Sequence, residues 1–411
     1  MSFINNFQLM AKPSGSKCNI DCSYCFYLEK EKLYPNRKEN WRMSDEVLEK
    51  YIEKNILSQT SNMVDFLWQG GEPTLLGLDF FRRAIIFQEK YRNGKVINNY
   101  FQTNGINLDE SWMEFFKKNN FLIGISIDGD QEYNDFYRKS RSGKSTFKSV
   151  CRTIELLKNY QIEFNTLTVV NNHNVKNPLR VYEFLKEIGS THIQFSPLVE
   201  RITNQPDSSG LTLISPSFLG DSNVAEWSVD GIDYGRFLNE IFNFWAQNDI
   251  GNIYVVNFEQ IMMKMVGENS SCIISESCGG NLIVESNGDI YSCDHFVYPE
   301  YKIGNICDDT SLINVVNSKE NIDFGNSKSM NISVDCTGCA VKPLCNGGCP
   351  KHRFLISSNG KPNKNYFCDA YKMHLKYAVP AMAYIIESLQ NGVSFLRIKN
   401  DLKMILPKLK Y

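Results

Sequence analysis

The stretch that decides the fold lies near the start of the chain and reads Cys18-Asn19-Ile20-Asp21-Cys22-Ser23-Tyr24-Cys25-Phe26-Tyr27. Its three cysteines follow an apolar run at residues 7–10 that is typical of a β-strand. Three thiolates at this spacing do not complete a tetrahedral zinc site unless a distant fourth ligand joins them. They do suit a four-iron cluster in which one iron has no protein ligand. We therefore predict an open iron–sulfur site, with buried or zinc-binding cysteines as the alternative.

The residues beyond this stretch alternate between two apolar patterns up to about residue 200. Runs rich in β-forming residues predict strands, and stripes with helical spacing predict helices between them. The expected strands are 7–10, 63–69, 96–102, 121–127, 162–170 and 192–198, and the expected helices are 43–57, 78–91, 110–117, 146–159 and 178–188. Such alternation gives parallel strands joined by right-handed crossovers. We therefore predict an α/β fold that is barrel-like or doubly wound.

The composition is typical of a soluble globular chain: of 411 residues, 42% are hydrophobic and 22% are charged, and the formal net charge is −2. This balance gives no basic field that would attract nucleic acid or anionic lipid. No apolar run approaches the ~18 residues of a transmembrane helix, and the first residues lack the pattern of a signal peptide. We expect a cytoplasmic protein with no nucleic-acid or membrane partner.

The thirteen cysteines are unevenly distributed, which indicates two modules. A disulfide framework is typical of small secreted domains, whereas clustered cysteines in a reducing compartment indicate metal. Cys151 falls on an apolar helical stripe and is expected in the core, and Cys307 is expected to be structural. The remaining eight could complete two four-thiolate sites, either zinc sites or iron–sulfur clusters. These eight are Cys272, Cys278, Cys293, Cys336, Cys339, Cys345, Cys349 and Cys368.

The patterns divide the chain into four parts, which are an α/β domain at 1–235, a helical linker at 236–265, a cysteine-rich domain at 266–375 and a helical tail at 376–411. Residues 202–230 are rich in Ser, Gly, Pro and Asn and predict an inserted loop, either a lid or a disordered excursion. In the third part, Asn287-Gly288 predicts a hairpin between 282–285 and 289–292, with loop elsewhere. An apolar helix is expected around 379–389.

Glycine and polar motifs follow the ends of the predicted strands, where α/β folds bind ligands. Gln69-Gly70-Gly71-Glu72-Pro73 follows the second strand. Its glycines allow a close approach of backbone to ligand, and Glu72 can receive an ammonium group. Two further motifs follow the third and fourth strands and are Gln102-Thr103-Asn104-Gly105 and Ser126-Ile127-Asp128-Gly129, with Arg138 after them.

The C-x3-C-x2-C spacing with these motifs resembles the radical S-adenosylmethionine (SAM) superfamily, in which the open iron binds SAM. The later cysteine spacing resembles the SPASM domain. Narrower still, a set of stretches over roughly residues 8–375 resembles the anaerobic sulfatase-maturating enzymes: CSYCFYLEKEKLY, WQGGEPTLLGLDFF, FQTNGINLDESW, LIGISIDG, IQFSPLVER, VESNGDIYSCDHFVYPEYKIGNI and CNGGCPKHRF.

The resemblance implies a partial (β/α)6 TIM-like radical SAM barrel with a C-terminal SPASM domain. It also implies three 4Fe-4S clusters with SAM as cofactor. By motif position, the cluster ligands are Cys18, Cys22 and Cys25 for the first, Cys272, Cys278, Cys293 and Cys349 for the second, and Cys336, Cys339, Cys345 and Cys368 for the third.

Members of that family convert a Cys or Ser side chain of a sulfatase into formylglycine. The 5′-deoxyadenosyl radical removes a hydrogen atom from Cβ, after which a carboxylate takes a proton and a cluster takes an electron. Asp294 occupies the position of the family's base, with a turn residue supporting Cys293 as the alternative. Tyr27 and Gln69 match positions that face the substrate peptide. The implied SAM contacts are Tyr24, Gly70, Gly71, Glu72, Ser126, Arg138 and Val199.

The implied partners are an unfolded or nascent sulfatase segment of the type C/S-x-P-x-R and a reduced flavodoxin or ferredoxin. Asp130 and Asn134 stand where the family often has proline and histidine, whereas Arg138 is retained. The three histidines near or after the cysteines are expected to be structural rather than ligands, and these are His295, His352 and His374.

Two other functions remain open at this point. One is a SPASM maturase that forms thioether or carbon–carbon crosslinks in a ribosomal peptide. The other is a non-enzymatic electron carrier or zinc scaffold, which leaves the GGEP motif and the open three-cysteine site unexplained.

Overall fold

The structure is a computed structural model that describes residues 3–408 except 35–39, 207–209, 219 and 269. Within these residues, ten strands form one sheet in the order β12-β11-β10-β1-β2-β3-β4-β5-β6-β9. Neighbours from β10 to β9 are parallel, whereas β11 and β12 pair antiparallel at one edge. The strands are β1 (Gln8–Lys12), β2 (Met63–Trp68), β3 (Val96–Thr103), β4 (Phe121–Ser126), β5 (Phe164–Val170), β6 (His192–Pro197), β9 (Tyr254–Val255), β10 (Asn281–Glu285), β11 (Asp289–Tyr291) and β12 (Lys302–Asn305).

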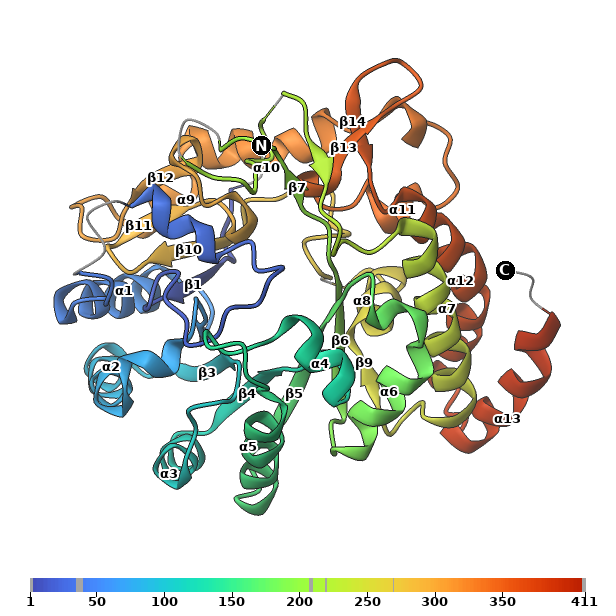
Figure 1. The fold of residues 1–411 in the computed structure, drawn as a ribbon, viewed down its shortest axis with the longest axis horizontal. Helices are drawn as coiled ribbons and strands as arrows, with labels where there is room; N and C mark the ends of the chain where they lie inside the picture. The colour runs from blue at the N-terminus through green and yellow to red at the C-terminus, as the bar shows by residue number, and fades with distance from the viewer. Residues whose placement is uncertain (1–2, 35–39, 207–209, 219, 269, 409–411) are drawn as a thin grey trace.

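The helices between the parallel strands lie along the outer face of the curved sheet (Figure 1). Each buries an apolar stripe, as α5 does with Val150, Ile154 and Leu157. At the start of α1 the Ser44 hydroxyl accepts a hydrogen bond from the Val47 amide and caps the helix. The predicted alternation of strands and helices is confirmed. These helices are α1 (Asp45–Ser58), α2 (Leu78–Tyr91), α3 (Glu110–Lys118), α5 (Phe147–Asn159) and α6 (Pro178–Glu187).

A short helix that the sequence analysis did not anticipate, α4 (Gln131–Tyr137), follows β4. Asp130 caps it by accepting from two backbone amides and pairs with Arg180 at 2.6 Å. Asn134 is fully buried, and its side-chain amide donates to Thr146 Oγ1 at 3.2 Å. The two residues that depart from the family pattern therefore hold the loop that leads to Arg138.

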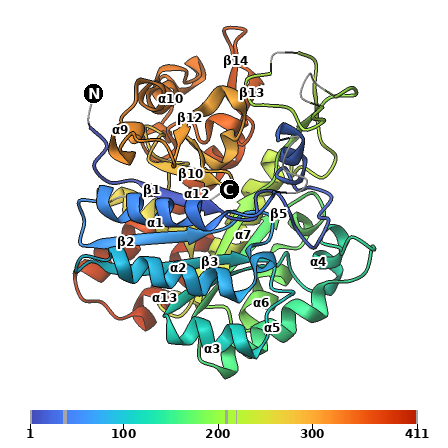
Figure 2. The ribbon, with the colours of Figure 1, turned by 90° about the vertical axis from the view of Figure 1, so that its left-hand side faces the viewer.

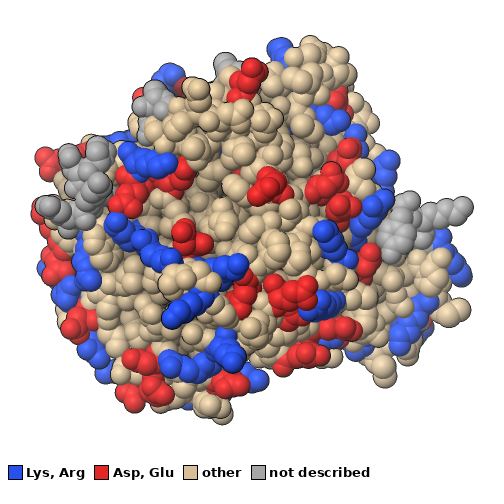
Figure 3. All heavy atoms as spheres, in the orientation of Figure 1, with Lys and Arg blue, Asp and Glu red and all other residues tan. Residues whose placement is uncertain are grey.

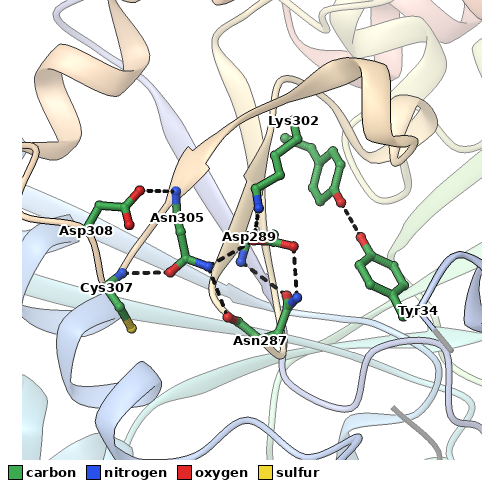
Figure 4. Close-up of polar contacts among 8 residues, drawn as sticks. Tyr34, Asn287, Asp289, Lys302, Asn305, Cys307 and Asp308 are labelled. Carbon is green, nitrogen blue, oxygen red and sulfur yellow. Dashed lines mark hydrogen bonds and ion pairs between the residues drawn. The ribbon is translucent and has the colours of Figure 1, made fainter. Parts of the chain in front are cut away.

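The cysteine-rich region is joined to the barrel through the sheet itself, because β10 pairs in parallel with β1 over five residues, including Lys12 beside Glu285. The predicted hairpin is confirmed, and Asn287-Gly288 turns between β10 and β11. Figure 4 shows how Asn305 of β12 ties this turn together by donating to Asn287 O and Asp289 Oδ1. Figure 2 shows α9, α10 and β12 of the cysteine-rich region stacked on the β1 end of the barrel.

The expectation of loop elsewhere in the cysteine-rich region is wrong. Ser318 caps helix α10 (Lys319–Met330) by accepting from the Asn321 amide. The sequence of this helix is largely polar, so it lacks the apolar stripe from which a helix could be predicted. The other elements are α9 (Leu312–Val316), α11 (Lys342–Cys345), β13 (Arg353–Ile356) and β14 (Pro362–Asn365).

Four further helices cover the β9 side of the sheet. The expected apolar segment around 379–389 lies inside α12 (Cys368–Gln390), which packs along α7 (Gly231–Asn248). Gly235 of α7 approaches Ala370 so closely that a Cβ there would come within 3.0 Å of the Ala370 Cα. The other two are α8 (Val256–Met265) and α13 (Phe395–Ile405). Among the described residues, no helix is long and apolar enough to cross a membrane.

The insert at 202–230 begins at the short antiparallel pair β7 (Arg201–Ile202) and β8 (Asn223–Val224). The described part of the insert is hydrogen-bonded to two other segments of the chain. The Glu29 carboxylate accepts hydrogen bonds from the Thr212 and Leu213 amides at 2.9 Å, and Glu300 accepts from Ser217 Oγ at 2.9 Å. This part of the insert is therefore bound to the protein rather than a free surface excursion.

Positive and negative side chains are interspersed over the face in Figure 3, as the near-zero net charge leads one to expect.

Candidate active site

One cavity opens at the carboxyl ends of β1 to β4, and the three N-terminal cysteines line it together with most of the motif residues. Parallel strands end at the same edge, which is why motifs far apart in the sequence meet there. The lining residues are Ser16, Cys18, Ile20, Cys22, Tyr24, Cys25, Tyr27, Leu28, Gln69, Gly70, Gly71, Gln102, Thr103, Asn104, Ser126 and Arg138.

Burial raises the pKa of all three cysteine thiols in the cavity. It raises the pKa of Cys18 to about 11 and that of Cys22 to about 12, and it also raises the pKa of Cys25. Arg138 opposes the shift at Cys22 by favouring its thiolate. Thiols held in this way become thiolates only when a metal displaces their protons.

Arg138 joins this cavity to a buried polar chain. The Arg138 guanidinium donates to the Tyr24 hydroxyl at 3.0 Å, and that hydroxyl donates to Asp128 Oδ2 at 2.6 Å. Arg138 Nε is buried and has no hydrogen-bond partner among the described residues. Because an unpaired buried N–H is costly, this donor is suited to an acceptor on a ligand in the cavity.

The glycines of the GGEP motif allow a close backbone approach. The Gly71 amide donates to Gly15 O at 2.7 Å, and a Cβ at Gly71 would lie 2.0 Å from Lys17 O. Gly70 has a φ of +156°, which side chains rarely adopt. The two glycines thus hold the turn after β2 against the segment that leads into Cys18.

Glu72, for which a contact to SAM is expected, is hydrogen-bonded within the protein. Its carboxylate is fully buried and accepts from the Thr74 amide at 3.0 Å, Thr103 Oγ1 at 2.8 Å and the Asn104 amide at 2.9 Å. It does not line the cavity, because these three donors already hold it in the protein interior. Glu72 therefore positions the loop after β3. Val199 is likewise buried in the core and does not line the cavity.

Two lining residues were quoted in a sequence motif without being given a role. Gln102 Nε2 donates to Ser126 Oγ at 2.9 Å, which connects the ends of β3 and β4. Asn104 Nδ2 donates to Asn19 Oδ1 at 2.7 Å and lies 3.6 Å from Cys18 Sγ. Their position after strand three is the signal that could have identified them.

Asp294 lies on the side of the Tyr27 ring that faces away from the cavity. Two charged residues that the sequence analysis did not single out, Lys12 and Glu285, also contact Tyr27. Lys12, which is 2% exposed, forms an ion pair with Asp294 at 2.5 Å and lies over the Tyr27 ring at 4.4 Å. The Tyr27 hydroxyl donates to the buried Glu285 carboxylate. Burial would raise the pKa of Asp294, but Lys12 and His295 overcome this effect and lower it. The ion pair with Lys12 therefore favours the ionised form of the carboxylate.

Eight of the C-terminal cysteines form two sets. The inner set consists of Cys272, Cys278, Cys293 and Cys349. Burial raises the pKa of Cys278, Cys293 and Cys349, and the neighbouring Cys272 raises each further. The other set lines a single cavity and is called the outer set: Cys336, Cys339, Cys345 and Cys368.

The four thiols of each set match the four ligands of a complete four-iron cluster.

The remaining cysteines and histidines lie outside these sets. Cys151 is half-buried, so the core position expected for it is wrong: it lies beside, not on, the buried stripe of α5. Cys307 is exposed, and its amide donates to Asn305 Oδ1 at 2.9 Å (Figure 4). His374 is buried and hydrogen-bonded to Asn239 at 2.9 Å. His295 Nδ1 lies 3.5 Å from Cys349 Sγ, and His352 is buried nearby.

Comparison with known proteins identifies the family. A model of the radical SAM superfamily matches residues 13–185, and a model of SPASM, an iron–sulfur cluster-binding domain, matches residues 272–340. A serine-type anaerobic sulfatase-maturating enzyme of Bacteroides thetaiotaomicron is 40% identical and covers 100% of this chain and 98% of the relative. The chain belongs to the anaerobic sulfatase-maturating enzymes. A cysteine-type member from Clostridium novyi is 33% identical over 94% of this chain and 99% of its own length.

Solved structures agree with this assignment. The anaerobic sulfatase-maturating enzyme anSMEcpe, with bound AdoMet (SAM) and the Cp18Cys peptide, matches with a TM-score of 0.80 and 32% identity over 93% of this chain and 99% of that one. SuiB of Streptococcus suis, bound to its precursor peptide SuiA, has a TM-score of 0.58 but 15% identity and shares the fold alone. The chain is a radical SAM barrel enzyme with a SPASM domain, and its cofactors are iron–sulfur clusters and SAM.

Proposed function

We propose that this enzyme oxidises a Cys or Ser side chain of a sulfatase segment to formylglycine. The observation that carries the proposal is the position of Tyr27, which lines the cysteine cavity and contacts the Lys12–Asp294 pair on its other side. A peptide side chain held at Tyr27 would lie between the site of radical formation and an ionised carboxylate.

The first half of the reaction belongs to the N-terminal cavity. When bound there, the cluster and SAM supply the 5′-deoxyadenosyl radical that removes a hydrogen atom from Cβ. We assign Cys18, Cys22 and Cys25 as the cluster ligands. The backbone at Gly70 and Gly71 borders the cavity, and Arg138 Nε offers a free donor to SAM.

The second half belongs to Asp294. Its carboxylate removes the thiol or hydroxyl proton of the target residue, and Lys12 keeps it ionised and oriented for this task. Gln69, which lines the same cavity as Tyr27, is placed to contact the peptide. The electron released with the proton requires a nearby acceptor, and the inner set includes Cys293, which directly precedes Asp294.

We assign one 4Fe-4S cluster to the inner set and one to the outer set, which gives three clusters in the enzyme. The clustering of thiols described above supports this division. Oxygen-sensitive clusters and thirteen unpaired cysteines favour a reducing compartment, so we place the enzyme in the cytoplasm with a reduced flavodoxin or ferredoxin as electron donor.

The test uses anaerobically reconstituted enzyme and three sulfatase-derived peptides that differ only in Cys, Ser or Ala at the target. Formylglycine formation lowers the peptide mass by about 18 for Cys and about 2 for Ser, because thiol or alcohol becomes aldehyde. The Ala peptide should be unchanged. The relatives include both serine-type and cysteine-type enzymes, so the ratio of the two products assigns the target. A crosslinked product would contradict the proposal and favour a peptide maturase.

A further inference from the structure

A lysine in helix α10 is buried directly against the loop that carries two cysteines of the inner set. Lys328 is 0% exposed, and its Nζ donates to the backbone carbonyls of Cys272 at 2.5 Å and Ile273 at 3.0 Å. Within the described residues it forms no ion pair with a carboxylate. A buried ammonium without a counter-ion is costly, so an anionic group close by is expected.

The same face of α10 contacts the second half of this loop. Gly325 O accepts from the Cys278 amide at 3.1 Å, and a Cβ at Gly325 would lie 2.7 Å from Cys278 O. Asn321 Nδ2 donates to Gly279 O at 2.9 Å. Asn321, Gly325 and Lys328 recur at helical spacing, so one face of α10 covers the loop. Figure 1 shows α10 over the β10–β12 end of the sheet.

The anionic group that matches Lys328 is the inner set itself. Its ammonium group interacts electrostatically with Cys278, Cys349 and Cys272, and also with the like-charged Arg353. Four thiolates carry more negative charge than an iron–sulfur core neutralises, and nearby charge is one of the terms that set a cluster's reduction potential.

The outer set has a different charge environment. Besides Arg353, the cations that line its cavity are Lys342, Lys364 and Lys372, which are exposed or half-exposed, so water screens them. Arg353 lies between the sets: its guanidinium donates to the carbonyls of Lys328, Asn346, Gly347 and Gly348, and it interacts with thiols of both. Arg353 is therefore common to the two sets. Lys351 also acts on Cys349 but is ion-paired with Glu200, so Lys328 is the buried cation of the inner set that has no carboxylate partner among the described residues.

We infer that Lys328 is the dedicated counter-cation of the inner set and raises the reduction potential of the cluster held there above that of the outer one. This inference rests on the ligand sets proposed above. It gives the cluster next to Asp294 the greater affinity for an electron, as the proposed oxidation requires.

The experiment compares Lys328→Gln, which keeps a hydrogen-bond donor but removes the charge, with Lys328→Arg, which keeps both. Each variant is reconstituted anaerobically, and reduction is followed by electron paramagnetic resonance during a potentiometric titration. We expect full iron content, a negative shift of one auxiliary midpoint potential in Lys328→Gln and little shift in Lys328→Arg. Lys372→Gln changes a lysine beside the outer set and is the matched control. It should not shift the midpoint potential that Lys328→Gln shifts.

An unchanged midpoint in fully loaded Lys328→Gln would overturn the inference, as would an equal shift of the same signal by Lys372→Gln. Loss of one cluster from both Lys328 variants would also overturn it, because Lys328 would then be a structural clamp on the Cys272 loop. Loss from Lys328→Gln alone would support it, since charge would be what the cluster needs. A failure of the proposed ligand sets is distinguishable, because the wild-type enzyme would then hold fewer than about twelve irons.

Discussion

The N-terminal and C-terminal cysteine regions hold the same kind of ligand in opposite settings. Cys18, Cys22 and Cys25 line an open cavity with one ligand too few to complete a cluster. The inner and outer sets have four thiols each, and basic side chains such as Lys328 and Arg353 lie beside them. With the proposed ligands, the number of thiols therefore separates a cluster with one open iron from two clusters whose irons are all bound by the protein.

The two regions also differ in how they reach the substrate. The N-terminal cavity lies at the carboxyl ends of parallel strands, where α/β barrels bind small molecules. The C-terminal region contributes Asp294 through the pairing of β10 with β1, which brings Asp294 next to Lys12. The continuous sheet is what places a carboxylate from one region within reach of the cavity of the other.

The largest effect should come from removing the open site. In a variant with Cys18→Ala, Cys22→Ala and Cys25→Ala, we expect iron to fall from about twelve to about eight per chain, because each cluster holds four irons. Cleavage of SAM to 5′-deoxyadenosine should be abolished. Iron analysis and chromatography of the products measure both. Residual SAM cleavage would contradict the separation of the two regions.

The corresponding variant in the C-terminal region is Cys339→Ala in the outer set. Iron should again fall to about eight, but SAM cleavage should persist, because the outer set does not line the cavity. Formylglycine output should drop while 5′-deoxyadenosine is still formed. Complete loss of SAM cleavage in a folded protein that keeps its other clusters would show that the two regions are not separable.

A smaller effect is expected from Lys12→Met, which keeps the side-chain length and removes the charge. Asp294 would then lack its ion-pair partner, so we expect formylglycine output to fall by about tenfold or more, with iron content and SAM cleavage retained. Lys12→Arg is the matched control and should recover part of the activity. Unchanged formylglycine output in Lys12→Met would mean that Asp294 acts without the ion pair to Lys12.

The smallest effect is expected at the hairpin that joins the two regions. Asn305→Ala removes two hydrogen bonds to the Asn287–Asp289 turn (Figure 4). We expect a loss of about 1–2 kcal/mol in the free energy of unfolding and a Tm lower by about 1–2 °C, without a change in iron content. Differential scanning calorimetry measures the shift. Loss of the inner cluster instead would mean that this turn also supports Cys293.

The barrel could be predicted from the sequence because its strands and helices have clear apolar periods and its motifs fall at strand ends. Lys12 and Glu285 could not be predicted, because their importance depends on the pairing of β1 with β10, strands from opposite ends of the chain. Helix α10 was missed because its sequence is polar. The three internal donors to the Glu72 carboxylate could not be predicted either, because they come from Thr74 and from Thr103 and Asn104 at the end of the neighbouring strand.

The most direct test of the account is Asp294→Asn, which keeps size and hydrogen bonding but removes basicity. The measurement is the ratio of formylglycine to 5′-deoxyadenosine produced by enzyme with full iron content. We expect retained SAM cleavage and formylglycine lower by about 10²-fold or more, so that cleavage runs uncoupled from product. Formylglycine at a near wild-type rate would contradict it, and a loss of iron would instead make Asp294 a structural support for Cys293.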